Sequence, residues 1–217
     1  MRCVLYTDAH PDNPLLSLEV APLIARYIAS QQHPFLHQTS KAVRAAMGTT
    51  TPSEFRVIGY NERNRTEQIL ILLEARCAQY RLHSISIIKV ILDVHTPRLA
   101  AVLRRCPHLT SLNLTGTRIT QWPDIAEALP SCPHLEHLDV THCYLRHYTD
   151  HFAPCMSAVT GLTKLNLSGN SLFREGQLHW VTDALPQCTR LHHLDLSSNG
   201  LTMAHAALLE LVLPQCP

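Results

Sequence analysis

Apolar residues recur along this chain in one pattern, in which an aliphatic or aromatic residue is followed by others three, five and usually ten positions later. The clearest copies read LTSLNLTGTRI, LEHLDVTHCYL, LTKLNLSGNSL and LHHLDLSSNGL, at residues 109–119, 135–145, 162–172 and 191–201. Two weaker copies, LHSISIIKVIL and FRVIGYNERNR, precede them at 82–92 and 55–65. Successive copies begin 26 to 29 residues apart, and such a fixed period predicts a solenoid of stacked units.

Each unit is predicted to contain one strand and one helix. Apolar and polar residues alternate at the start of every copy, as they do in a strand whose side chains point to opposite faces. Segments with helical spacing follow and predict helices at 66–79, 97–106, 123–132, 175–188 and 204–216. The fold class is therefore α/β, a solenoid with parallel strands on its concave face and helices on its convex face.

The last two copies match the pattern LxxLxLxxNxL in full, with Asn170 and Asn199 at the asparagine position. These units resemble the leucine-rich repeat family, and their length and Cys-Pro-His-Leu starts are similar to its ribonuclease-inhibitor-like and cysteine-containing subclasses. The resemblance implies a right-handed horseshoe in which that asparagine hydrogen-bonds the turn backbone from unit to unit. Thr117 and Cys143 replace it in two units, and Val90 in a third cannot form the bond.

A second segment, residues 14–47, lies outside the repeats and has helical spacing. One interpretation is an amphipathic cap that covers the open first repeat, as solenoids require. The other rests on the order L-P-x-E-[VL]-x-x-x-I-x-x-Y-[LI], which the segment follows with Ser17 in place of proline, and on Ser-Lys-Ala-Val-Arg at 40–44. Both stretches resemble an F-box. The residues that carry the resemblance, and that it implies bind an adaptor, are Leu16, Leu18, Val20, Ile24 and Tyr27.

Cysteine usage and charge limit the functional classes. Cys106, Cys132 and Cys188 lie three residues before the first leucine of a repeat, and Cys77 lies five before Leu82. We expect them to fill core positions as reduced thiols, too far apart for a disulfide framework, in a cytoplasmic or nuclear protein. A net charge of +1 gives no indication of nucleic acid, and the absence of a long apolar run predicts no membrane span.

Catalytic and metal motifs are not found in the sequence. It contains no phosphate loop, nucleophile elbow or metalloprotease helix, and its 15 histidines lack the spacing that brings four ligands to one metal ion. We therefore expect no enzyme activity, metal or cofactor, and predict a protein–protein interaction module. An F-box followed by leucine-rich repeats resembles the substrate receptors of cullin–RING ubiquitin ligases, which bind a Skp-like adaptor. The alternative is a scaffold subunit of a large protein or ribonucleoprotein assembly, with the N-terminal helices as a cap.

The predicted partner site is the concave face, where alternate strand residues point away from the core. Its candidate residues are small and polar: Ser111, Asn113, Thr115, His137, Asp139, Thr141, Lys164, Asn166, Ser168, His193, Asp195 and Ser197. Three segments are expected, namely an extension at 1–13, the helical segment at 14–47 and six repeats at 55–217. Because Cys216-Pro217 matches Cys132-Pro133 at the start of an earlier unit, we also expect the chain to be truncated there.

Overall fold

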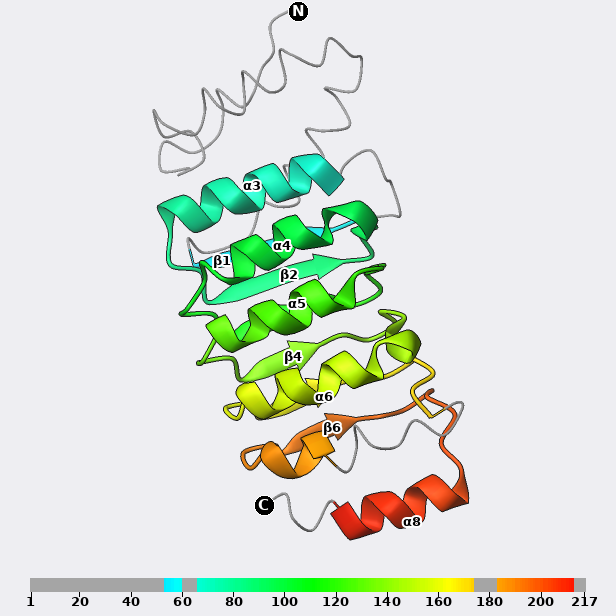
Figure 1. The fold of residues 1–217 in the computed structure, drawn as a ribbon. Helices are drawn as coiled ribbons and strands as arrows, with labels where there is room; N and C mark the ends of the chain where they lie inside the picture. The colour runs from blue at the N-terminus through cyan, green and yellow to red at the C-terminus, as the bar shows by residue number, and fades with distance from the viewer. Residues whose placement is uncertain (1–52, 60–65, 174–182, 213–217) are drawn as a thin grey trace, which may run out of the picture.

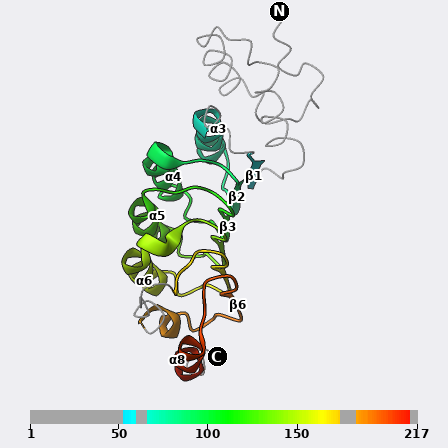
Figure 2. The same ribbon diagram turned by 90° about the vertical axis from the view of Figure 1, so that its right-hand side faces the viewer.

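The computed structural model describes residues 53–59, 66–173 and 183–212, and its strands form one parallel sheet in chain order (Figure 1). The strands are β1 (Glu54–Ile58), β2 (Ser84–Ile88), β3 (Ser111–Asn113), β4 (His137–Asp139), β5 (Lys164–Asn166) and β6 (His193–Asp195). The helices are α3 (Thr66–Gln79), α4 (Thr96–Leu103), α5 (Trp122–Ala128), α6 (Thr149–Ala158) and α8 (Met203–Val212). Helices α3 to α6 stack on one side of the sheet and leave its other face open (Figure 2). This arrangement is an α/β solenoid, whereas horseshoe curvature stays a prediction.

The helices agree with the predicted ranges at most but not all positions. Helix α3 has the predicted bounds, and α5 ends at Ala128, where a 3-10 turn over Leu129–Ser131 begins. That turn contains Pro130, which lacks the N–H that an α-helix would need. Helix α6 is absent from the prediction because Pro154 lies inside it and interrupts the helical pattern. Most of the predicted helix at 175–188 lies outside the described residues.

The first repeat differs from its predicted register. The pattern aligns Phe55 with Leu82, but in the sheet Phe55 pairs with Ile85, three positions further along. Phe55 and Val57 are buried, while Ile58, predicted to point inward, is 39% exposed. The prediction was wrong because the apolar residues of this unit alternate with period two, and that alternation, not the spacing of three, sets which side chains face the core.

The core runs through all units between the sheet and the helices. The leucines that open the units, such as Leu109, Leu135 and Leu162, are fully buried, and burial of each stabilises the fold by about 1.5–3 kcal/mol. The thiols that lie three residues before the opening leucine of a unit are buried as well: Cys106, Cys132 and Cys188. This confirms that these cysteines occupy small core positions.

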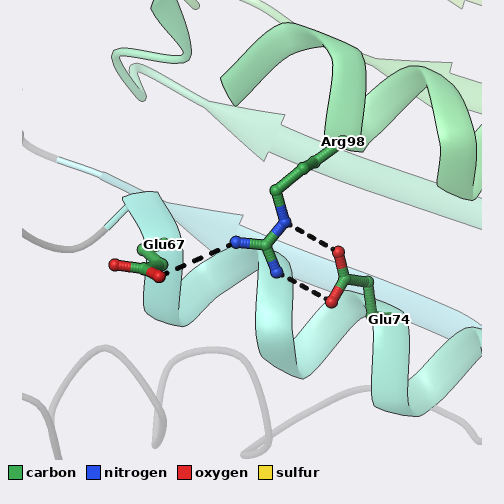
Figure 3. A network of polar contacts seen from close by, with 3 residues as sticks. All are labelled: Glu67, Glu74 and Arg98. Atoms are coloured by element: carbon green, nitrogen blue, oxygen red, sulfur yellow. Dashed lines mark hydrogen bonds and ion pairs between the residues drawn. The ribbon is translucent and has the colours of Figure 1, made fainter. Parts of the chain in front are cut away.

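One ion-pair network joins neighbouring helices on the outer side of the solenoid (Figure 3). Arg98 of α4 donates two hydrogen bonds to Glu74 of α3, at 2.9 and 2.8 Å, and its third nitrogen lies 4.0 Å from Glu67. The side chains of Arg98 and Glu74 are each 35% exposed, so solvent weakens the pair. We assign it about 0.5–1 kcal/mol, a small addition to the packing of α4 on α3.

Candidate functional site

The strand register places the predicted partner-binding residues in rows on the open face of the sheet, called the sheet face below. Successive strands pair residue for residue, and this builds a first row from Ser111, His137, Lys164 and His193. The same pairing builds a second row from Asn113, Asp139, Asn166 and Asp195. Backbone bonds continue the ladder past the strand ends to a third row of Thr115, Thr141, Ser168 and Ser197. The structure therefore brings the candidates of all three rows together on the sheet face.

Residues of the second row share an internal role. In each of four units, the side-chain oxygen of the second-row residue accepts a hydrogen bond from the backbone N–H two residues further on, at 2.9–3.0 Å. The donors are Thr115, Thr141, Ser168 and Ser197. Such a bond turns the chain out of the strand and thereby ends it. In Asp195, the hydrogen bonds from Ser197 hold the pKa of the carboxyl below its usual range.

The third row is tied to the second row and to itself. The hydroxyls of Thr115 and Thr141 both donate to Asp139, at 3.0 and 2.7 Å. The hydroxyls of Ser168 and Ser197 lie 2.8 Å apart and share a hydrogen bond. Sequence reasoning missed these bonds, although each of these four units carries the signal Asn/Asp-x-Thr/Ser, beginning at the last residue of its strand. Much of the polar surface of the sheet face therefore maintains the turns.

Only the first row is left without such a role. Among the described residues, no hydrogen bond or ion pair involves the side chains of Ser111, His137, Lys164 or His193. Lys164 and His193 are exposed, and the row crosses four adjacent strands, which spans about 14 Å at the usual strand spacing. These side chains form a basic strip of histidine and lysine that can contact a partner without disturbing the turns.

Behind the sheet face, the predicted asparagine ladder is confirmed. Asn170 donates to the carbonyls of Val140 and Leu167, at 2.8 and 2.9 Å, and its Oδ1 accepts from Cys143 N at 2.8 Å. Asn199 repeats the arrangement one unit later, donating to Leu167 at 2.9 Å. Each bond to the preceding unit locks two neighbouring turns together.

Two substitutes keep part of the ladder. The Thr117 hydroxyl donates to Ile87 O at 2.8 Å, and the Cys143 thiol donates to Leu114 O at 2.9 Å. These carbonyls occupy the position that Val140 has relative to Asn170. Threonine and cysteine thus retain the donor of asparagine and lack the carbonyl oxygen that accepts from the preceding turn.

The turns after β2 to β6 each contain a left-handed residue at the same position. The eighth position of successive units has φ of 55, 64, 53, 71 and 56°, and glycine occupies it twice, at Gly116 and Gly169. At His142 the ring lies against the next unit, with Nδ1 3.2 Å from Gly169 O. A side chain added at Gly169 would overlap that ring, so a glycine is needed there.

Two cysteines lie in contact, although the cysteines were expected to be too far apart for a disulfide framework. The sulfur atoms of Cys77 and Cys106 are 3.2 Å apart, and both are free thiols. Cys77 precedes its repeat leucine by five residues instead of three, which places it on the last turn of α3, facing the turn that follows α4. Cysteines at the same position of two neighbouring repeats would lie further apart than these two.

Neither a metal centre nor a membrane span occurs among the described residues. No three His, Cys, Asp or Glu side chains gather into a possible metal site within the described ranges. None of the helices described has both the length and the apolar composition needed to cross a bilayer. The F-box-like residues Leu16, Leu18, Val20, Ile24 and Tyr27 lie outside the described part of the chain.

Comparison with known families identifies the repeating unit. A family model described as Leucine Rich repeat matches residues 105–121, 131–145 and 187–202, which hold β3, β4 and β6. A search of curated proteins finds no match to the chain. Three units of the solenoid therefore match the leucine-rich repeat, a unit that generally serves protein–protein interaction and is typically not catalytic.

Proposed function

We propose that this chain is a non-catalytic protein-binding module that holds a partner on its sheet face. The observation that carries the proposal is the first row, whose side chains, partly exposed at Ser111 and His137 and exposed at Lys164 and His193, make no hydrogen bond within the described structure. The backbone beneath them is fixed by a continuous parallel ladder, so a partner meets a preorganised surface.

The chemistry of the rows indicates what kind of partner surface would fit. Lys164 and the two histidines of the first row favour acidic or hydroxyl-bearing side chains opposite them. The carboxylates of Asp139 and Asp195 lie in the next row and disfavour an acidic group there. A partner with acidic side chains over the first row and donors over the second is therefore favoured, and charge selects the orientation in which it binds.

A charge reversal tests this proposal. We expect Lys164→Glu combined with His193→Glu to abolish recovery of specific partners when the full chain is purified from cells and its associated proteins are quantified. Arg104→Glu, an exposed change at the end of α4, is the matched control and should retain them. Circular dichroism checks that both variants fold. If the first-row variant keeps every partner that Arg104→Glu keeps, the sheet face is not the binding surface.

We propose further that residues 14–47 bind a Skp-like adaptor, which would make the protein a substrate receptor of a cullin–RING ubiquitin ligase. Support comes from the apolar spacing of Leu16, Val20 and Ile24 and from the repeats that follow the segment. Docking of an apolar helix face on a helical partner is a common recognition mode. In the alternative, the same residues cap the first repeat and the protein is a scaffold subunit.

Purified adaptor distinguishes the two roles. We expect the wild-type chain to bind a Skp-type adaptor in calorimetry and the Leu16→Asp/Ile24→Asp variant to remain folded without binding. Gln31→Asp, in the polar stretch between the two apolar segments, is a control for added charge and should bind normally. Loss of folding in the double variant, or equal binding by it and the wild type, would contradict the adaptor proposal.

A further inference from the structure

A pair of thiols lies between the first two units, apart from the sheet face. The Sγ–Sγ distance of 3.2 Å between Cys77 and Cys106 exceeds a disulfide bond by only about 1.2 Å. Cys77 lies in the last turn of α3 and Cys106 in the turn between α4 and β3. A small displacement of either segment would bring the sulfur atoms to bonding distance.

Exposure separates Cys77 from the other described cysteines. Cys77 is partly exposed, whereas its neighbour Cys106 is 3% exposed and Cys132, Cys143, Cys155 and Cys188 are buried as well. The Cys77 thiol lies 3.7 Å from the carbonyl of Arg105 as well as 3.2 Å from Cys106 Sγ. Among the described cysteines, Cys77 is thus the one that is partly exposed, and it has a second sulfur in contact.

The contact also shifts the pKa values of the two thiols in opposite directions. The hydrogen bond from Cys106 lowers the pKa of Cys77 to about 7, and the nearby Arg105 acts in the same direction, against the effect of burial. Donation of that hydrogen bond raises the pKa of Cys106, and burial raises it further. Near neutral pH, Cys77 is therefore the nucleophile and Cys106 the sulfur that keeps its proton.

We propose that Cys77 and Cys106 form a reversible oxidation site, at which a low-molecular-weight disulfide such as oxidised glutathione converts the two thiols into an intramolecular disulfide. The Cys77 thiolate attacks one sulfur of oxidised glutathione, and the other half leaves as a thiolate that takes up a proton. The Cys106 thiol then loses its proton and attacks Cys77 Sγ, and the second glutathione leaves as a thiolate and is protonated. Two cysteine thiols are thereby oxidised while one glutathione disulfide is reduced to two thiols.

Closure would have a structural consequence for the solenoid. The disulfide would join α3 of the first unit to the turn before the third strand, 29 residues along the chain. Such a cross-link restricts the unfolded chain and prevents α3 from separating from its neighbour. We expect the unfolding midpoint of the oxidised protein to rise by roughly 5–10 °C over the reduced protein.

Peptide mapping tests the proposal directly. Trypsin cleaves after Arg76, Arg81, Arg105 and Arg118, so peptides 77–81 and 106–118 each carry one of the two cysteines and no other. We expect glutathione redox buffer followed by acid quenching and alkylation to yield these peptides linked to each other, and dithiothreitol to separate them. Cys132→Ser, at the equivalent position one unit later, is the control and should give the same linked product.

Single substitutions test the order of the steps. Cys106→Ser should stop the reaction at a glutathione adduct on Cys77, and Cys77→Ser should leave Cys106 unmodified. Both are checked for folding by circular dichroism. The proposal is overturned if the wild type accumulates the same stable adduct as Cys106→Ser, if the linked peptides arise only between two chains, or if neither cysteine reacts in the folded wild type.

Discussion

Replacing Asn170 with alanine tests whether the ladder holds neighbouring repeats together. The asparagine is 2% exposed and bonds to groups of its own unit and of the preceding one. Alanine removes all of these bonds at once. Leu167 O keeps a second donor, Asn199 Nδ2 at 2.9 Å, but Cys143 N, Leu145 N and Val140 O lose the only partner that the described structure gives them.

The expected loss follows from those three orphaned groups. A buried donor or acceptor without a partner costs about 1–3 kcal/mol, so the variant should lose about 3–5 kcal/mol of unfolding free energy, allowing for the small cavity. Asn166→Ala is the matched control in the same unit. Its oxygen accepts one bond, from Ser168 N at 3.0 Å, at a partly exposed site that water can reach, so we expect a loss of about 1 kcal/mol.

Urea unfolding followed by far-ultraviolet circular dichroism and tryptophan fluorescence measures both losses, and coincident transitions justify a single free energy. Amide hydrogen exchange adds a local readout, because the Cys143 N–H should exchange faster in Asn170→Ala than in Asn166→Ala. A loss below about 1 kcal/mol, or equal losses in the two variants, would refute the view that the ladder carries inter-repeat stability.

Two further predictions concern the turn and the thiol pair. Gly169→Ala should lower the free energy of unfolding by about 2 kcal/mol, because φ is +71° and the new Cβ would overlap the His142 ring. In a protein that already carries His142→Gly, the same substitution should cost about half as much, as a double-mutant cycle of denaturation experiments would show. Equal losses in the two backgrounds would exclude the clash with His142. Alkylation of Cys77 by iodoacetamide should rise with pH to half its maximum near 7, because the thiolate reacts, and Cys106→Ala should move that midpoint towards about 8.5. A wild-type midpoint near 8.5 would mean that neither Cys106 nor Arg105 lowers the pKa.

The strands could be predicted from sequence because the apolar residues of each repeat indicate which side chains are buried. Leucines at the first, fourth and sixth positions point to one side of a strand, and a period of 26 to 29 residues stacks them in chain order. The first unit failed because FRVIGY fits two registers, and only pairing with β2 selects the one that buries Phe55 and Val57. Helix α6 was missed for a related reason, since packing on α5 outweighs the local effect of Pro154.

The site was predicted less completely. Alternation along the strands identified which side chains face outward, and the rows confirm that geometry. It could not distinguish side chains that serve the turns from those that do not, because both kinds are small and polar. The Cys77–Cys106 contact likewise depends on how the end of α3 meets the turn after α4, which is a property of the stack and not of either repeat.

Under the proposed function, the rows on the sheet face separate stability from recognition. Substitution of Asp139 should affect three turn contacts and so the fold, whereas substitution of Lys164, on the neighbouring strand, removes no internal hydrogen bond of the described structure. Because second-row and third-row side chains make these internal bonds, substitutions in those rows would weaken a turn. First-row side chains are free of that constraint, so different binding specificities can be built on the same solenoid by changing that row alone. Recognition in such a repeat protein then depends on few positions per unit, each set by the strand register.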